Sequence, residues 1–325
     1  MNQFVQEALA IPPSELDKND SDKETNKPYT FLHALASSSR SPTWLRDQIV
    51  AVLLAGRDTT ASTLSWLFFE LAQRPDVVQK LRAEVLSTVG PDAAATYEQL
   101  KSMKYMSWTL NEILRLYPSV PMNTRTACCD TTLPRGGGPD GTSPIGIPKG
   151  TEVAYSAYNL QLNAEHYPPP DSAEYIDPTL FEPERWRTWT PKPFTYLPFN
   201  VSIPIPFPIP LLFHDIATCH IQPRHCANLP HLSQGGPRIC VGQQFALMEM
   251  SAALVRILQR FETIQLGPSM AGIVKRSQAE EHRRLCYKDG VESHAFRFAM
   301  KMDRVLKMTH DPILTPGGKV DVVFA

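Results

Sequence analysis

One cysteine of this chain stands where it could bind a metal ion. Cys240 directly precedes a helix predicted over residues 241–261, and Gly236 and Gly242 flank it. The free amides and the positive end of a helix favour the thiolate, which is the form of cysteine that ligates metals. Small flanking residues would let a flat macrocycle approach the backbone. A cysteine before a helix is also commonly a buried packing residue, so this pattern alone leaves both interpretations open.

Two further patterns place polar groups on helices. Glu112 and Arg115 are three residues apart in a helix predicted over residues 97–117, so they share one face and can form an ion pair. On a solvated surface such a pair contributes little to stability. Asp58 and Thr59 offer a carboxylate and a hydroxyl, although threonine hydroxyls inside helices commonly bond to the helix's own carbonyls. Each pattern is weak when it is taken alone.

The elements that would position these residues have recognisable boundaries. Three prolines start or end helices: Pro42, Pro75 and Pro118. Helices are predicted over residues 41–73, 75–89, 97–117 and 241–261, and a β-strand over residues 152–158. Residues 315–324 are predicted to form a turn that leads into a terminal strand. Residues 118–200 are rich in proline and glycine, which indicates small sheets and loops. Apolar residues on several faces of the helix over 241–261 predict that it lies inside the protein.

The composition excludes several classes of protein. The chain has 325 residues, 42% of them hydrophobic, and its 32 basic residues nearly balance its 33 acidic ones. It is therefore globular and has no overall field that would attract nucleic acid. Its six cysteines show neither zinc-site spacing nor the density of a disulfide scaffold, which favours a reducing compartment. A membrane span over residues 41–73 is disfavoured by Arg57 and Asp58 in its middle.

The residues around Cys240 complete a longer motif if an intervening block is removed. Without residues 201–234, Phe199 and Asn200 would join Gly235 and give the sequence FNGGPRICVG. This sequence resembles the signature Phe-x-x-Gly-x-Arg-x-Cys-x-Gly of the cytochrome P-450 family of haem-thiolate monooxygenases. The segments NEILRLYP with PERW, and AGRDTT, resemble two other motifs of that family. Residues 29–266, apart from the block, are similar to its fungal branch that hydroxylates alkanes and fatty acids.

The resemblance implies the fold of that family: mostly α with small β-sheets, present here as the carboxy-terminal part. Residues 1–325 would then form one truncated domain, whose amino-terminal half and membrane anchor are expected to be missing. The first thirty residues agree with that expectation, because they contain no basic start followed by a long apolar run.

The resemblance also implies a role for each candidate residue. Cys240 would ligate the haem iron, with Gly236 and Gly242 beside the macrocycle, and Arg125 and Arg238 would pair with the haem propionates. Glu112, Arg115 and Arg185 would form a buried bridge with a structural role. Gly56 would leave room for dioxygen, while Asp58 and Thr59 would deliver protons.

The implied reaction is haem-dependent monooxygenation of an apolar small molecule such as an alkane, a fatty acid or a lipid-like metabolite. NADPH-cytochrome P-450 reductase would supply the electrons. The full-length form would lie on the cytosolic face of the endoplasmic reticulum membrane, and no nucleic acid is expected as a partner. One alternative is a nonfunctional truncated product of the same gene that cannot hold haem.

The block at residues 201–234 is interpreted as a non-native insertion, a retained intron. It begins with Val-Ser and ends with Gln, which the usual ends of an intron can encode in frame, and its alternating prolines fit no packed element. A different interpretation is a metal-binding interaction module, because histidines and cysteines are crowded within the block. These residues are His214, Cys219, His220, His225, Cys226 and His231, and their spacing matches no zinc pattern.

Overall fold

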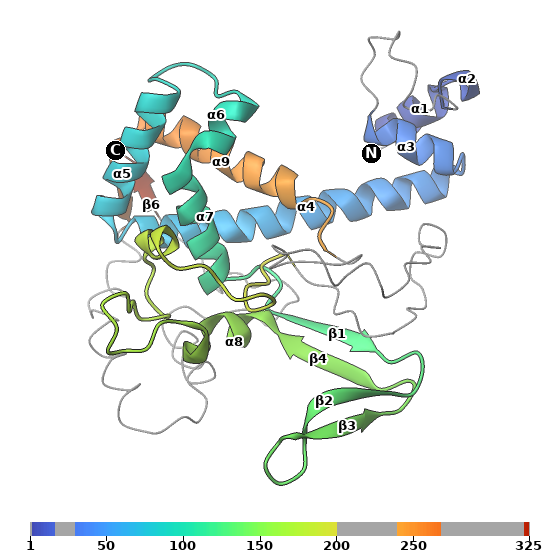
Figure 1. Ribbon diagram of the computed structural model, residues 1–325. Coiled ribbons are helices and arrows are strands. Elements are labelled where there is room, and N and C mark those ends of the chain that lie inside the picture. Colours follow the sequence, from blue (N-terminus) through green and yellow to red (C-terminus); the bar gives the residue numbers. More distant parts are fainter. Residues whose placement is uncertain (1, 17–29, 200–238, 268–321, 325) are drawn as a thin grey trace. The chain divides into compact units, whose positions relative to one another are not determined.

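The computed structural model describes residues 2–16, 30–199, 239–267 and 322–324 (Figure 1). The chain divides into two compact units, residues 1–59 and residues 60–325, and the long helix α4 (Pro42–Leu71) belongs to both. Its start agrees with the prediction, since the Ser41 hydroxyl accepts a hydrogen bond from the Trp44 amide at 3.4 Å. The block at residues 201–234 lies outside the described residues.

The first unit packs short helices around a small apolar core. The helices are α1 (Asn2–Ala10), α2 (Pro13–Leu16), α3 (Phe31–Ser38) and the first part of α4. Arg40 holds the end of α1, because its guanidinium donates to the carbonyls of Ala8 at 3.2 Å, Ile11 at 3.0 Å and also Leu9. These carbonyls at a helix end have no partner within the helix, so the arginine satisfies them.

The second unit is built on helices that bury a larger core. These helices are the end of α4, α5 (Pro75–Thr88), α6 (Tyr97–Ser102), α7 (Lys104–Leu116), α8 (Ala157–Leu162) and α9 (Gln243–Arg260). Helix α7 packs against α5 and α8, and α9 packs against α5 and α6 (Figure 1). Trp66 at the centre of this core stacks on Tyr117, with ring centroids 4.2 Å apart.

The single helix predicted over residues 97–117 is wrong, because the chain forms two helices that meet at Met103. Met103 has an extended backbone, with φ −72° and ψ 102°. The carboxylate of Glu84 on α5 accepts hydrogen bonds from the amides of Tyr105 at 2.9 Å and Met106 at 2.8 Å. A side chain of a neighbouring helix therefore caps α7, and this long-range contact outweighs the local helical preference.

Small antiparallel sheets form where proline and glycine are frequent. Strand β1 (Met122–Thr126) pairs with β4 (Glu152–Ser156), β2 (Thr131–Gly137) pairs with β3 (Ser143–Ile147), and β5 (Ile264–Leu266) pairs with β6 (Val322–Phe324). Two 3₁₀ turns, η1 (Ala164–His166) and η2 (Pro183–Arg187), interrupt the loops. The predicted fold, mostly α with small β-sheets, is confirmed.

The expectation that the last long helix lies inside the protein holds for only part of α9. From Met250 onward its apolar side chains, such as Leu254 and Leu258, belong to the core. By contrast, Phe245 in the first turns is 71% exposed, and Val241 just before the helix is fully exposed. Apolar periodicity cannot show which turns of a helix meet a neighbour, so the sequence overestimated the burial of this end.

Among the residues that the structure describes, none of the helices combines the length and the apolar content that crossing a membrane requires. The membrane-span interpretation of α4 is thus not supported.

One carboxyl group of the core should make the stability of the second unit depend on pH. Glu70 accepts a hydrogen bond from the Tyr117 hydroxyl at 2.7 Å. Burial raises the pKa of Glu70 from 4.5 to about 7, although the Tyr117 hydrogen bond and the Arg74 charge oppose this rise. Because the pKa is raised in the folded state, the stability that Glu70 contributes is present below about pH 4.5. It is lost as the pH rises through about 7.

We therefore expect Glu70→Gln to stabilise the protein at pH 8 by up to about 3 kcal/mol, and to have little effect near pH 4.5. The amide oxygen can still accept from Tyr117, while the buried charge is removed. Urea unfolding followed by tryptophan fluorescence at both pH values measures the difference, with Glu249→Gln on the exposed face of α9 as the control. An equal effect of Glu70→Gln at the two pH values would contradict the assignment.

Candidate functional site

Glu112, Arg115 and Arg185 meet in the interior of the second unit. Arg115 makes a two-pronged contact with Glu112, from Nε to Oε2 and from Nη2 to Oε1, each at 2.8 Å. Arg185 on η2 donates from Nε to the same Oε1 at 3.3 Å. The three side chains are at most 2% exposed. The structure thus brings together three residues that are up to 73 positions apart in the sequence.

The carboxylate at the centre of this bridge is held in its charged form. Burial by itself would raise the pKa of Glu112, but the charge and hydrogen bonds of Arg115, and then the charge of Arg185, hold it below its ordinary value. Two arginines around one carboxylate leave a net positive charge. Arg185 and Arg115 share it with backbone carbonyls, including those of Ile176 and Pro178, at 2.7 and 2.5 Å respectively.

Aromatic residues that the sequence analysis did not single out complete the bridge. Trp186 donates from its indole nitrogen to Glu112 Oε2 at 2.8 Å. The Tyr167 hydroxyl accepts a hydrogen bond from Arg115 at 3.0 Å. The guanidinium groups of Arg115 and Arg185 lie 5.5 and 5.3 Å, respectively, from the centroid of the Tyr167 ring. Trp186 could have been found as the neighbour of Arg185, whereas nothing in the sequence distinguishes Tyr167.

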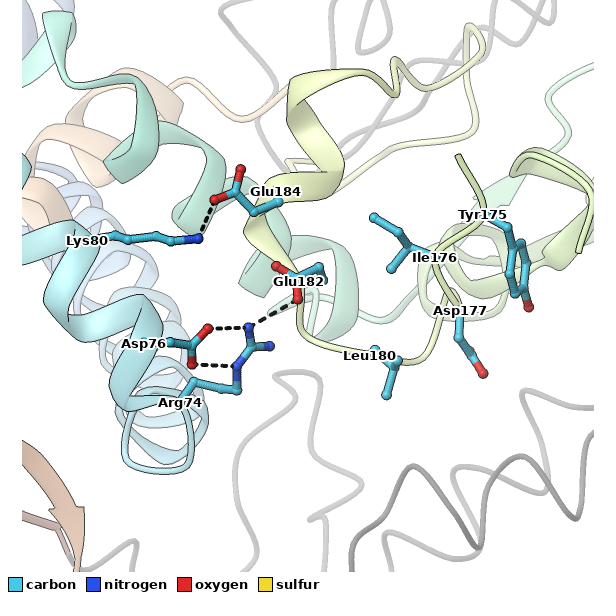
Figure 2. A pocket seen from close by; sticks show the side chains of 9 residues that line it. All are labelled: Arg74, Asp76, Lys80, Tyr175, Ile176, Asp177, Leu180, Glu182 and Glu184. Carbon is cyan, nitrogen blue, oxygen red and sulfur yellow. Dashed lines mark hydrogen bonds and ion pairs between the residues drawn. The ribbon is translucent and has the colours of Figure 1, made fainter. Parts of the chain in front are cut away.

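A second layer of ion pairs fixes η2 from the side of α5. These ion-paired side chains line a surface pocket of about 700 Å³. Figure 2 shows how they lie around it. Arg74 donates to the Phe181 carbonyl at 2.6 Å and to Glu182 at 3.1 Å, and Lys80 pairs with Glu184 at 2.6 Å. These ion pairs anchor the loop that carries η2 to the start of α5.

Cys240 is exposed and lies just before α9. Its amide donates a hydrogen bond to the carbonyl of Phe199 at 3.0 Å, so the two ends of the interrupted motif lie side by side. Among the residues that the structure describes, an added Cβ at Gly242 would meet only the sulfur of Cys240, at 3.8 Å, which is an ordinary contact. Packing within this part of the chain therefore does not require glycine at position 242.

These residues fit a flat apolar cofactor with a sulfur-ligated metal. The thiol is accessible, the position after it carries the fully exposed Val241, and the first turns of α9 carry the exposed Phe245. Large apolar side chains at the surface indicate contact with something apolar. Of the other residues expected at this centre, Gly236 and Arg238 lie outside the described residues, as does the histidine and cysteine cluster at 214–231. Groups of three or more potential metal ligands do not occur in the described part of the chain.

Arg125, expected at the haem propionates, lies on β1 and is partly buried. It donates to the Asn123 side chain at 3.0 Å and to the Thr124 carbonyl at 2.7 Å, and it stacks over Tyr155. These contacts hold the guanidinium close to its own strand.

Asp58 and Thr59 lie at the end of the first unit, whereas Cys240 belongs to the second. The Thr59 hydroxyl donates to the Ala55 carbonyl at 2.6 Å, as helix threonines commonly do. Asp58 is partly exposed and lies 3.7 Å from Arg57. No atom of the described residues lies within 4 Å of a Cβ added at Gly56, so packing in this part of the chain does not explain a glycine in mid-helix.

Comparison with known proteins identifies the class. A family model described as "Cytochrome P-450" matches residues 2–201 and 235–269, and the match leaves out residues 202–234. The chain belongs to the cytochrome P-450 family.

Individual curated members of this family are similar to the chain. The chain is 45% identical over 265 residues to cytochrome P-450 monooxygenase pvhE of Talaromyces variabilis, covering 82% of this chain and 42% of the relative. It is 40% identical over 293 residues to cytochrome P-450 52A13 of Debaryomyces hansenii, covering 89% and 47%. For cytochrome P-450 52A10 of Candida maltosa the identity is 42% over 274 residues, covering 82% and 44%. The chain spans less than half the length of these relatives.

Removal of the central carboxylate should strongly destabilise the second unit. Glu112→Ala leaves Arg115 and Arg185 buried without a counter-charge, which we expect to lower the free energy of unfolding by about 3–5 kcal/mol. Glu249→Ala, which removes an exposed carboxylate of α9, should change it by less than about 0.5 kcal/mol. Urea unfolding measures both variants. Equal stabilities of the two variants would show that the buried bridge does not hold this unit together.

Proposed function

We propose that this chain carries the haem-ligating part of a monooxygenase that inserts one atom of dioxygen into a C–H bond of an apolar substrate, while the other atom leaves as water. One observation carries the proposal. The hydrogen bond from the Cys240 amide to the Phe199 carbonyl joins the two halves of the cysteine motif and leaves the thiol exposed at the start of a helix.

In this proposal Cys240 would ligate the iron of a haem, and Arg125 and Arg238 would pair with its propionates. A haem with a thiolate ligand supplies the means to cleave the O–O bond. The positive end of α9 stabilises the charged sulfur. Gly236 and Gly242 keep side chains away from the macrocycle, and the absence of a packing reason for glycine at position 242 supports this role. The bridge of Glu112, Arg115 and Arg185 is structural.

Proton delivery is assigned to Asp58 and Thr59. The Asp58 carboxylate exchanges protons with solvent, which its partial exposure permits, and the Thr59 hydroxyl passes a proton onward. For this step the hydroxyl must leave the Ala55 carbonyl, to which it donates at 2.6 Å. Gly56 leaves room for dioxygen, and a glycine here costs the helix roughly 1 kcal/mol relative to alanine.

The substrate is proposed to be an alkane, a fatty acid or a lipid-like metabolite, on the basis of the similarity to the 52A relatives. NADPH-cytochrome P-450 reductase would deliver the electrons. The full-length form would act at the cytosolic face of the endoplasmic reticulum membrane.

Residues 201–234 are proposed to be a non-native insertion, either a translated retained intron or a gene-model error. Support comes from the interruption of the family match over residues 202–234 and from the contact between Phe199 and Cys240 across the block. Sequencing the mature transcript tests this: a message without these codons is expected, and a spliced message that retains them would exclude the idea.

The second candidate is a nonfunctional product that cannot hold haem. It is favoured by the exposure of Val241 and Phe245, since a chain without a partner for these side chains presents them to water. In that case the 325-residue chain would aggregate or bind haem poorly, whereas a full-length form without residues 201–234 would bind it fully.

Replacement of the cysteine tests its assignment as the haem ligand. In a full-length form in which Asn200 joins Gly235, the reduced carbon monoxide complex should show the red-shifted thiolate band. Cys240→Ala should abolish both this band and turnover, because alanine offers no ligand. Cys129→Ala, which changes another exposed cysteine, is the control and should retain them. Oxygenase activity of the Cys240→Ala variant would exclude the assignment.

Replacement of the threonine tests proton delivery. Thr59→Ala should bind haem normally, but much of the NADPH that it consumes should yield hydrogen peroxide instead of product, because the hydroxyl that would deliver the proton is missing. Thr59→Ser keeps the hydroxyl and should restore coupling. If Thr59→Ala still couples NADPH use tightly to product, the hydroxyl serves only the helix carbonyl.

A further inference from the structure

One buried side chain links the end of α7 to the segment that leads to the cysteine. Gln161, in the last turn of α8, is 1% exposed. Its amide nitrogen donates to the carbonyls of Leu114 at 3.2 Å and Arg115 at 2.9 Å, and its amide oxygen accepts from the Leu197 amide at 2.7 Å. A side-chain amide has two N–H groups, so both donors are used. A flipped amide would place oxygen against oxygen, and the partners therefore fix its orientation.

The two carbonyls at the end of α7 have no donor within the helix. Leu114 would accept a hydrogen bond from the residue four positions later, but this residue is Pro118, which has no N–H. The side chain of Arg115 is held by Glu112 through two hydrogen bonds of 2.8 Å. Gln161 is thus bound to the end of a helix whose position the buried bridge already fixes.

The chain between Leu197 and Phe199 has little freedom to absorb a displacement. Pro198 stands between them, and its ring fixes its own φ and confines the preceding residue to an extended backbone. Leu197 is also buried, and it packs against Ala157. A shift of the Leu197 peptide therefore moves the Phe199 carbonyl, which accepts a hydrogen bond from the Cys240 amide at 3.0 Å.

A second anchor holds the same segment by a side chain and not by the backbone. The Tyr196 hydroxyl donates to the Asn111 carbonyl at 3.2 Å. Rotatable side-chain bonds separate this hydroxyl from the tyrosine backbone, whereas the Leu197 amide is itself part of the backbone. Gln161 therefore constrains the peptide more directly than Tyr196 does.

We propose that Gln161 is a positioning residue for the cysteine. It fixes the Leu197 peptide, hence the Phe199 carbonyl, and through that carbonyl the backbone of Cys240. The consequence for haem rests on the proposed function of Cys240 as the ligand. A ligand held about 1 Å out of place binds its metal weakly, so loss of this link should loosen the bond between sulfur and iron. In this role Gln161 acts through the backbone and takes no part in the chemistry.

Hydrogen exchange of the Cys240 amide tests the link without haem. In the 325-residue chain labelled with ¹⁵N-cysteine, Gln161→Met removes the donors and the acceptor at similar side-chain length, and should speed this exchange about tenfold. Gln161→Glu keeps an oxygen for the Leu197 amide and should give a smaller increase. Tyr196→Phe is the matched control, because it removes a buried hydrogen bond to α7 one residue away, and it should have little effect. An unchanged rate in Gln161→Met, or equal rates in Gln161→Met and Tyr196→Phe, would overturn the proposal.

A measurement on the unsubstituted chain covers the case in which Gln161→Met fails to fold. At low urea concentrations, hydrogen exchange reports the opening that exposes each amide. The amides of Leu197 and Cys240 should become exposed in one opening, with the same dependence on urea. If Cys240 exchanges through a separate opening while Leu197 stays protected, the link is rejected.

A spectrum reports the effect on the haem ligand. In the full-length form in which Asn200 joins Gly235, Gln161→Met should move a large part of the reduced carbon monoxide complex from the red-shifted thiolate band to an unshifted band. Tyr196→Phe should retain the thiolate band. An unchanged spectrum in Gln161→Met would overturn the role of Gln161 at the ligand. If the unsubstituted protein itself lacks the thiolate band, the proposed function fails, and the exchange measurements still decide whether Gln161 holds the cysteine backbone.

Discussion

The buried carboxylate of Glu112 is the constraint on which the second unit depends. A charge that is removed from water must be paired and hydrogen-bonded, or folding fails. Glu112 meets this requirement through Arg115, Arg185, Trp186 and the amide of Glu182, the last at 3.0 Å. All but Arg115 come from a region without regular periodicity. One carboxylate on α7 therefore fixes the path of a long irregular segment.

The same helix also sets the position of the segment that reaches the cysteine. The Tyr196 hydroxyl donates to the carbonyl of Asn111, beside the bridge, at 3.2 Å. The amide of Leu197 donates to the side chain of Gln161 at 2.7 Å, and this side chain in turn donates to the carbonyls of α7. Two residues after Leu197, the carbonyl of Phe199 accepts a hydrogen bond from the amide of Cys240. A structural bridge and a ligand position thus share one scaffold.

The polar interior of this unit and its exposed thiol obey opposite requirements. Around α7 the buried charges are neutralised by partners within the chain, which makes the region rigid. At the start of α9 the apolar side chains and the sulfur remain open to solvent. A site that must accept an external group cannot satisfy itself internally. The contrast explains why the bridge satisfies its own charges, whereas the proposed reaction depends on a cofactor.

The sequence by itself determined the helices that begin or end at proline, the small sheets, the fold family and the three motifs, because these depend on residues close in the chain. The signature alone also predicted that Phe199 and Gly235 belong to one motif. Only the tertiary structure decided the break at Met103, the role of Tyr167 and the exposure of Phe245. A carboxylate from α5 caps α7, the tyrosine ring lies beside the two arginines, and the first turns of α9 carry an exposed Phe245. Such contacts join residues far apart in the chain, and neither periodicity nor spacing records them.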